Sequence, residues 1–301
     1  MPDAHDWAHC TPNLRALSYR FAVCCDDAAL GAHISVLLSS LRDPDPDPDA
    51  EVGGREPARH RYTLTASPDR AGTFDVRRDD ELVEPGLAPG VAVGWLVWDV
   101  NRLAAELSGE HLLFHSGGLE LEASGVGILV PAASGSGKST LTAGLVRAGL
   151  GYLSDELVAL ELDAASDVPG RLLPYPKPIT VKPGSFGVLA DMAPDLLDGE
   201  GDGEWQVPVG DGTGRRVGRP CRPGFVIVPR YDPSADTALV RLSETEAFFT
   251  LALHAVNLLP HGPAGSEALG RLAAQGACYA LAFSDLDVAC DRVLGLVGAR
   301  V

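Results

Sequence analysis

The sequence predicts an α/β fold with α+β elements, in which a small α+β region over residues 1–108 precedes a larger domain over residues 109–301. An apolar strand over residues 127–131 is followed by a helix over 139–148 and by a second apolar strand over 150–153. Two apolar strands around one helix are typical of a parallel βαβ unit, so we expect the two strands to lie close together.

The N-terminal region alternates strand and helix patterns. Aromatic and β-branched residues over 19–25 predict a strand, and apolar residues at helical spacing over 28–41 predict a helix. The same patterns predict two short strands over 61–65 and 73–77 and a helix over 91–107.

Residues 42–60 are expected to form a flexible loop. Within it, residues 43–49 read D-P-D-P-D-P-D, where proline removes backbone donors and the like charges repel one another. A segment of this composition cannot pack against a core. A docking tail for a specific partner is the alternative interpretation.

The larger domain shows a comparable series of elements. Residues 111–115 and 119–123 predict two strands joined by a turn at Ser116-Gly117-Gly118. The pattern S-E-T-E from Ser243 predicts a capping box at the start of a helix. The remaining predictions are a strand over 225–228, helices over 245–259 and 266–275, a strand over 279–283 and a helix over 286–297.

Charge and cysteine content limit the classes of partner and compartment. The formal net charge of −17 repels nucleic acid and anionic lipid, so we expect neither nucleic acid nor a membrane surface as a main partner. The sequence shows no signal-peptide pattern and no apolar run long enough for a transmembrane helix. Six cysteines without a C-x-x-C pair favour a cytoplasmic protein with reduced thiols.

The strongest chemical signal is the run A-A-S-G-S-G-K-S-T over residues 132–140. It follows a predicted strand and opens a predicted helix, which is the context of a phosphate-binding P-loop. Alanine stands at Ala132, where the usual pattern begins with glycine. We expect this loop to bind a nucleoside triphosphate, ATP or GTP, together with Mg²⁺.

Each residue type in the loop has a physical reason. Gly135 and Gly137 can adopt backbone angles closed to other residues, so that main-chain N–H groups surround the phosphates. Lys138 supplies positive charge to the β- and γ-phosphates, and the Ser139 hydroxyl is placed for Mg²⁺. The predicted nucleotide-binding residues are Ser134, Gly135, Ser136, Gly137, Lys138, Ser139 and Thr140.

The second signal is the acid pair Asp155 and Glu156, which begins seventeen residues after Lys138 at the end of the next predicted strand. We expect both carboxylates beside the γ-phosphate, where one would hold Mg²⁺ and the other would accept the proton of an attacking hydroxyl. Capping of a turn is the alternative. His115, at the end of a predicted strand, is a third candidate, with a purely structural role as its alternative.

These motifs together resemble the HPr serine kinase/phosphorylase family and its kinase relatives. The resemblance rests on F-H-S-G-G (114–118), the strand and loop over 127–140, G-Y-L-S-D-E (151–156), P-Y-P-K-P-I-T-V-K-P-G-S (174–185) and V-P-R-Y (228–231). It implies a phosphoenolpyruvate-carboxykinase-like nucleotide-binding domain and transfer of phosphate from ATP to a hydroxyl. It also implies that His115 and the acid pair belong to the site, with Asp155 favoured as the base.

The expected acceptor is a Ser/Thr-type hydroxyl on a peptide, a protein or a small molecule, and the sequence does not distinguish among these three. The protein could also form a homo-oligomer. Lys177, Lys182 and Arg230 could line a phosphate site, or they could be ordinary surface cations. The alternatives to a kinase are a nucleotide-hydrolysing switch and a binding module without catalysis.

Overall fold

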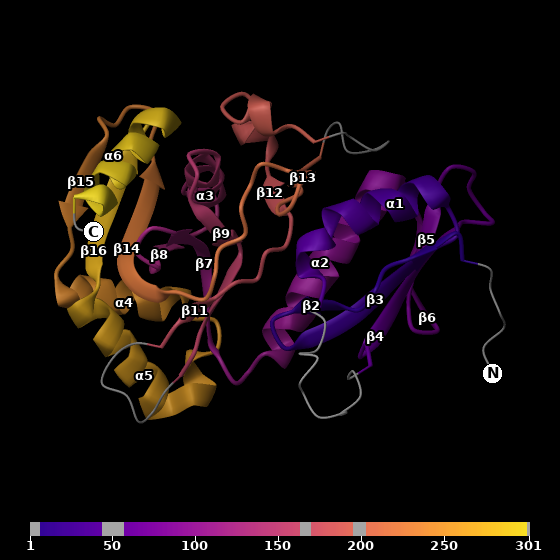
Figure 1. Ribbon diagram of the computed structural model, residues 1–301, viewed down its shortest axis with the longest axis horizontal. Helices are drawn as coiled ribbons and strands as arrows, with labels where there is room; N and C mark the ends of the chain where they lie inside the picture. The colour runs from indigo at the N-terminus through magenta and orange to yellow at the C-terminus, as the bar shows by residue number, and fades with distance from the viewer. Residues whose placement is uncertain (1–6, 44–56, 163–169, 195–202, 300–301) are drawn as a thin grey trace.

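The computed structural model describes residues 7–43, 57–162, 170–194 and 203–299. Within them lies a mixed α/β architecture with two large sheets and six α-helices. Figure 1 shows an N-terminal unit beside a larger C-terminal unit. The N-terminal unit contains β1 (His9–Cys10), β2 (Leu14–Ala16), β3 (Tyr19–Cys25), α1 (Ala28–Leu37), β4 (His60–Ala66), β5 (Phe74–Arg78), β6 (Glu81–Leu87) and α2 (Pro89–Leu107).

The C-terminal unit is built on an eight-stranded sheet with helices on both faces. Its strands are β7 (Leu112–Leu121), β8 (Val126–Pro131), β9 (Gly151–Ser154), β10 (Leu157–Leu160), β11 (Leu172–Leu173), β14 (Arg222–Tyr231), β15 (Ala238–Arg241) and β16 (Ala277–Phe283). A separate hairpin pairs β12 (Ile179–Val181) with β13 (Trp205–Val207). The helices are α3 (Lys138–Arg147), α4 (Glu244–His254), α5 (Leu258–Gln275) and α6 (Leu286–Gly298).

The N-terminal unit is one six-stranded sheet with order β1-β3-β4-β5-β6, and β2 also pairs with β3. A single apolar cluster joins α1 and α2 to these strands, because each helix buries a stripe such as Val93, Leu96 and Val100 of α2. The strand over 19–25 and the helix over 91–107 are confirmed as β3 and α2. The helix expected over 28–41 ends at Leu37, and most of the expected loop, residues 44–56, lies outside the described residues.

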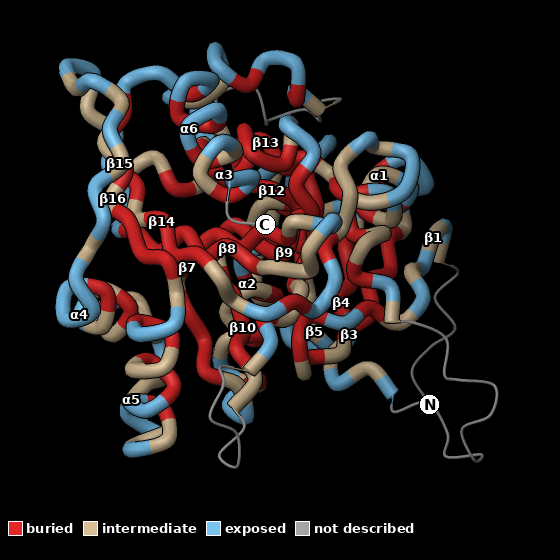
Figure 2. The backbone as a smooth tube through the Cα atoms, turned by 60° about the vertical axis from the view of Figure 1, so that its left-hand side comes forward, coloured by how far each residue is buried: buried red, intermediate tan, exposed pale blue. Residues whose placement is uncertain are grey.

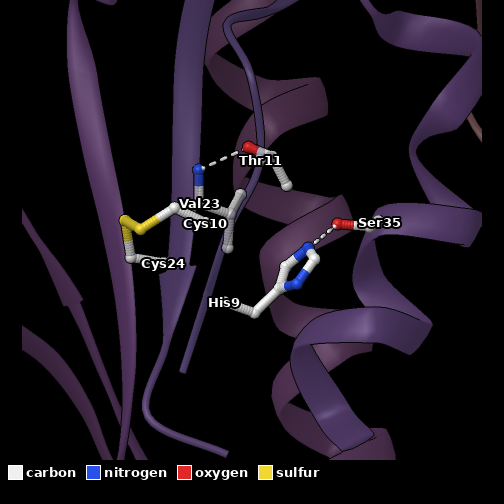
Figure 3. Close-up of a disulfide and its surroundings, with 6 residues drawn as sticks. All are labelled: His9, Cys10, Thr11, Val23, Cys24 and Ser35. Atoms are coloured by element: carbon white, nitrogen blue, oxygen red, sulfur yellow. Dashed lines mark hydrogen bonds between the residues drawn. A yellow bond between two sulfur atoms is a disulfide. The ribbon is translucent and has the colours of Figure 1, made fainter. Parts of the chain in front are cut away.

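The expectation that all thiols are reduced is wrong for one pair. Cys10 of β1 lies directly opposite Cys24 of β3, and the two form a disulfide (Figure 3). The backbone N–H of Val23 also donates to the Thr11 side chain beside it. The sequence did not reveal this pair because only the register of β1 on β3 brings the two cysteines together. Cys25, Cys221, Cys278 and Cys290 are buried free thiols.

We expect replacement of Cys10 and Cys24 by serine to lower the free energy of unfolding by about 3 kcal/mol, because the bond closes a loop with a sequence separation of 14. Urea unfolding of the variant and the parent protein, both without reductant, measures this difference. A thiol count on denatured, unreduced protein should give four rather than six. Six reactive thiols, or equal stability of the two proteins, would contradict the disulfide.

The large sheet has the order β11-β10-β7-β8-β14-β16-β15, and β9 pairs with β7. On one face α3 and α6 pack with the β12–β13 hairpin, and on the other face α4 and α5 pack. Figure 2 shows the buried backbone of the sheets between these outer layers. Strand β8 has a parallel neighbour, β14, and an antiparallel neighbour, β7.

One prediction about the centre of this sheet is wrong, and another is met in part. Strand β7 is continuous through Gly117 and Gly118 rather than a hairpin, since both glycines pair with β8. A side chain at Gly117 would meet the Thr142 hydroxyl of α3. These glycines provide room for close packing instead of a turn. The strands on either side of α3 run parallel as expected, because both are antiparallel to β7, but β7 lies between them.

The two units share apolar packing. Leu113 of β7, Leu157 and Ala159 of β10, and Tyr175 belong to the same buried cluster as α1 and α2. The N-terminal unit therefore rests on the β7–β10 side of the large sheet. The division of the chain at residue 108 remains a prediction.

The capping box at Ser243 is confirmed: the Ser243 side chain accepts a hydrogen bond from Glu246 N–H, and the Glu246 carboxylate accepts one from Ser243 N–H. The helix expected over 245–259 ends at His254, because the chain then bonds to β7: Val256 N–H donates to the Leu113 oxygen and Asn257 Oδ1 accepts from Leu113 N–H. Among the described residues, every helix is too short or too polar to cross a membrane.

Candidate functional site

A glycine-rich loop (residues 132–137) connects β8 to α3. Gly137 has φ +89° and directly precedes the helix, and Gly135 has φ +82°. A side chain at Gly137 would be strained and would meet the Phe283 ring at 2.8 Å. The loop is also held from outside, because Tyr231 N–H donates to the Ser136 oxygen at 2.9 Å. The loop therefore holds a fixed backbone conformation at the N-terminus of α3. A helix N-terminus of this kind can bind an anion through its free N–H groups.

Lys138 begins α3 and is only 5% exposed. Its Nζ donates to the backbone oxygen of Asp155 at 2.7 Å and lies 3.9 Å from Oε2 of Glu156. Burial lowers the pKa of this amine, although the nearby carboxylates of Glu156 and Asp155 oppose the shift. The amine of Lys138 lies between the start of α3 and Glu156.

Glu156 and His115 form a pair beside Lys138. His115 Nδ1 of β7 lies 3.2 Å from Oε1 of Glu156, which directly precedes β10, the neighbouring strand. Burial alone would raise the pKa of Glu156, but the hydrogen bond from His115 and the charge of Lys138 outweigh it and hold this pKa at about 2. Glu156 is therefore a carboxylate at neutral pH.

The two members of the acid pair lie in different surroundings. Asp155 is fully buried, and its Oδ1 lies 2.6 Å from Nζ of Lys177. The same carboxylate accepts hydrogen bonds from the Tyr152 hydroxyl at 2.7 Å and from Thr180 N–H at 3.1 Å. The two acids lie between β9 and β10, and both of these strands pair with β7. Glu156 lines the cavity described below and Asp155 does not, so the expected placement of both carboxylates beside the phosphate is not met.

The glycine-rich loop, Lys138, Glu156 and His115 line one cavity of about 660 Å³. Of the residues predicted from the sequence, its walls contain Ser134, Gly135, Gly137, Lys138, Ser139, Thr140, His115, Glu156, Lys177 and Lys182. Ser136, Asp155 and Arg230 are not in the walls. Arg230 is 69% exposed and pairs with Asp232, so the expectation that it lines a phosphate site is not met.

The structure adds site residues that were not predicted individually from the sequence. Tyr231 and Phe283 line the cavity on the β14–β16 side, where their rings meet edge to face. Ser185 also lines it and exchanges a hydrogen bond with Thr140 at 2.5 Å. Four residues of α2 also line it: Gly94, Val97, Trp98 and Asn101.

One sequence signal could have located the cavity. Lys138, Lys177 and Lys182 are the only lysines among 301 residues, and all three line it. Each has a carboxylate nearby, namely Glu156, Asp155 and Glu204 respectively. In a chain of net charge −17, this gathering of primary amines is a specific feature of the site.

The donor set suits a cation that keeps most of its ligands as water and phosphate oxygens. The Ser139 hydroxyl and the Glu156 carboxylate line the same cavity, whereas Asp155 is enclosed with Lys177. In the described parts of the chain, no group of three or more acidic, histidine or cysteine side chains could hold a metal by itself. One carboxylate and one hydroxyl fit Mg²⁺ bound together with a nucleotide.

No known protein family matches the sequence, and no curated protein matches it. Among solved structures, the HPr(Ser) kinase/phosphatase from Coxiella burnetii is weakly similar over 62% of this chain and 95% of its own. The sequence identity is 12% and the TM-score is 0.32. At this score the likeness carries no argument about function, which must come from the residues of the cavity.

Proposed function

We propose that this protein is an ATP- and Mg²⁺-dependent kinase that transfers the γ-phosphoryl group to a Ser/Thr-type hydroxyl on a peptide, a protein or a small molecule. The observation that supports this most directly is that the glycine-rich loop, Lys138 and the Glu156–His115 pair line one cavity. Phosphoryl transfer depends chiefly on positioning and on charge stabilisation, and this cavity supplies both.

Each group has a part in the proposed reaction. The loop N–H groups and the start of α3 bind the phosphates, and Lys138 stabilises the charge that develops on the transferred group. Glu156 accepts the proton as the acceptor oxygen bonds to the γ-phosphorus and the bond to the bridging oxygen of ADP breaks. His115 orients Glu156. The Ser139 hydroxyl would hold Mg²⁺ together with the phosphates, and the ion when bound neutralises phosphate charge.

We assign the base to Glu156 rather than to Asp155, which the sequence had favoured. Asp155 is enclosed by Lys177, Tyr152 and Thr180 and does not reach the cavity. Its role in the proposal is to hold Lys177 and, through its backbone oxygen, Lys138.

We expect Glu156→Gln to lower the rate of transfer about a hundredfold, the lower end of the contribution of a positioned general base, while ATP still binds. Labelled ATP and Mg²⁺ with fractionated cell extract reveal the acceptor, and titration calorimetry measures ATP binding. Glu204→Gln is the matched control, because Glu204 lines the same cavity but pairs with Lys182. Full transfer by Glu156→Gln would remove this base from the proposal.

A further inference from the structure

One face of α2 forms a wall of the cavity. Gly94, Val97, Trp98 and Asn101 all line it, and their spacing of three and four residues places them on one side of the helix. The N-terminal unit therefore contributes to a site whose phosphate-binding loop belongs to the C-terminal unit.

Two side chains of this face are available to a ligand. Trp98 is 58% exposed, whereas Val93, Leu96 and Val100 of the same helix are buried in the apolar cluster. The Oδ1 atom of Asn101 is buried and has no hydrogen-bond partner among the described residues. A buried amide oxygen that accepts no hydrogen bond costs folding free energy. A ligand that donates a hydrogen bond to it would remove this cost.

The helix that presents these groups is held firmly from behind. Asp99, buried on α2, accepts hydrogen bonds from the Tyr62 hydroxyl at 2.7 Å, from Arg78 at 2.9 Å and from Arg102 at 2.6 Å. The bonds from Tyr62 and Arg78 attach α2 to β4 and β5. The wall is thus a fixed surface that needs no ordering when a ligand binds.

The position of the wall identifies which substrate it faces. The glycine-rich loop lies between two groups of residues, His115 and Glu156 near β7 and β10 on one side, and Tyr231 and Phe283 of β14 and β16 on the other. Since α2 shares its apolar cluster with Leu113 of β7 and with β10, it stands on the side of the Glu156–His115 pair. In the proposed reaction this is the side from which the acceptor hydroxyl approaches.

We propose, building on the kinase function above, that the face of α2 formed by Gly94, Trp98 and Asn101 binds the acceptor, and that the acceptor is a peptide segment. Trp98 would contact an apolar or aromatic side chain beside the acceptor residue. Asn101 Oδ1 would accept a backbone N–H, a donor that a peptide offers at nearly every residue. Gly94, where a side chain would meet nothing within 4 Å, leaves room for the chain to pass.

The test uses the whole protein with labelled ATP, Mg²⁺ and a library of short serine peptides whose flanking positions are randomised in turn. Wild-type protein should prefer aromatic or apolar residues at one flanking position. Trp98→Ala should abolish that preference and raise the peptide KM about tenfold or more, with a smaller effect on the KM for ATP. Asn101→Leu should raise the peptide KM, and Asn101→Asp, which keeps an acceptor oxygen, should raise it less.

Val91→Ala is the matched control, because Val91 is exposed on α2 but does not line the cavity. Its peptide preference should equal that of the wild type. If wild-type protein binds and slowly hydrolyses ATP but labels no peptide, the peptide acceptor is overturned and the kinase proposal stands. An unchanged preference in Trp98→Ala overturns the role of α2. Failure of wild-type protein to bind ATP would instead overturn the kinase function.

Discussion

Replacement of Lys138 by methionine should lower phosphate transfer about a thousandfold, the largest catalytic effect that we expect from one substitution. Lys138 is buried at the start of α3, so no other cation can move into its place from solution. Methionine keeps most of the side-chain volume while it removes the charge. Initial rates of transfer from labelled ATP measure the loss.

Two measurements separate this effect from unfolding. Thermal unfolding should show that Lys138→Met remains folded, since the substitution removes a single hydrogen bond, to the Asp155 backbone oxygen. Arg292→Met removes a positive charge from the exposed surface of α6 and serves as the control. A Lys138→Met protein that transfers phosphate at more than a tenth of the wild-type rate would contradict the proposed site.

The largest effect on stability should come from Asp155→Leu, with a loss of about 3–5 kcal/mol in the free energy of unfolding. Asp155 is fully buried, and its removal leaves the buried amine of Lys177 without its carboxylate. It also leaves the Tyr152 hydroxyl and Thr180 N–H without their acceptor. Since small proteins are stable by only about 5–15 kcal/mol, the variant should be near the limit of folding.

The double variant Asp155→Leu/Lys177→Met identifies the cause. Because both charges are then absent, it should recover a large part of the lost stability in urea unfolding. If the double variant is no more stable than the single one, the loss comes from packing rather than from an isolated charge. Wild-type stability of Asp155→Leu would contradict the buried ion pair altogether.

The elements that the sequence predicted well depend on local patterns. Strand β3, helix α2 and the capping box at Ser243 follow from periodicity and from hydrogen bonds between near neighbours in the chain. Strand β7 was not predicted correctly, because Ser116-Gly117-Gly118 has the composition of a turn. In the structure its two glycines instead allow close packing against α3 and β10. The contacts responsible are distant in the sequence, so no local rule could reveal them.

In the candidate site, too, the features set by local sequence were predictable and those set by distant contacts were not. The loop conformation, with positive φ at Gly135 and Gly137, agrees with what residues 132–140 predict. The sequence could not separate the environments of Asp155 and Glu156, since these depend on Lys177 and Thr180, residues more than twenty positions further along the chain. The wall formed by α2 was equally hidden, because Trp98 reaches the cavity only through the packing of the N-terminal unit on β7 and β10.

The placement of the lysines has a practical consequence for handling the protein. Lys138 and Lys177 are buried, so Lys182, which is 64% exposed, is the one lysine side chain open to an amine-reactive reagent. A fluorophore coupled there would report directly on occupancy of the cavity. Immobilisation through Lys182 would obstruct the same opening, so attachment through another group is preferable for binding measurements.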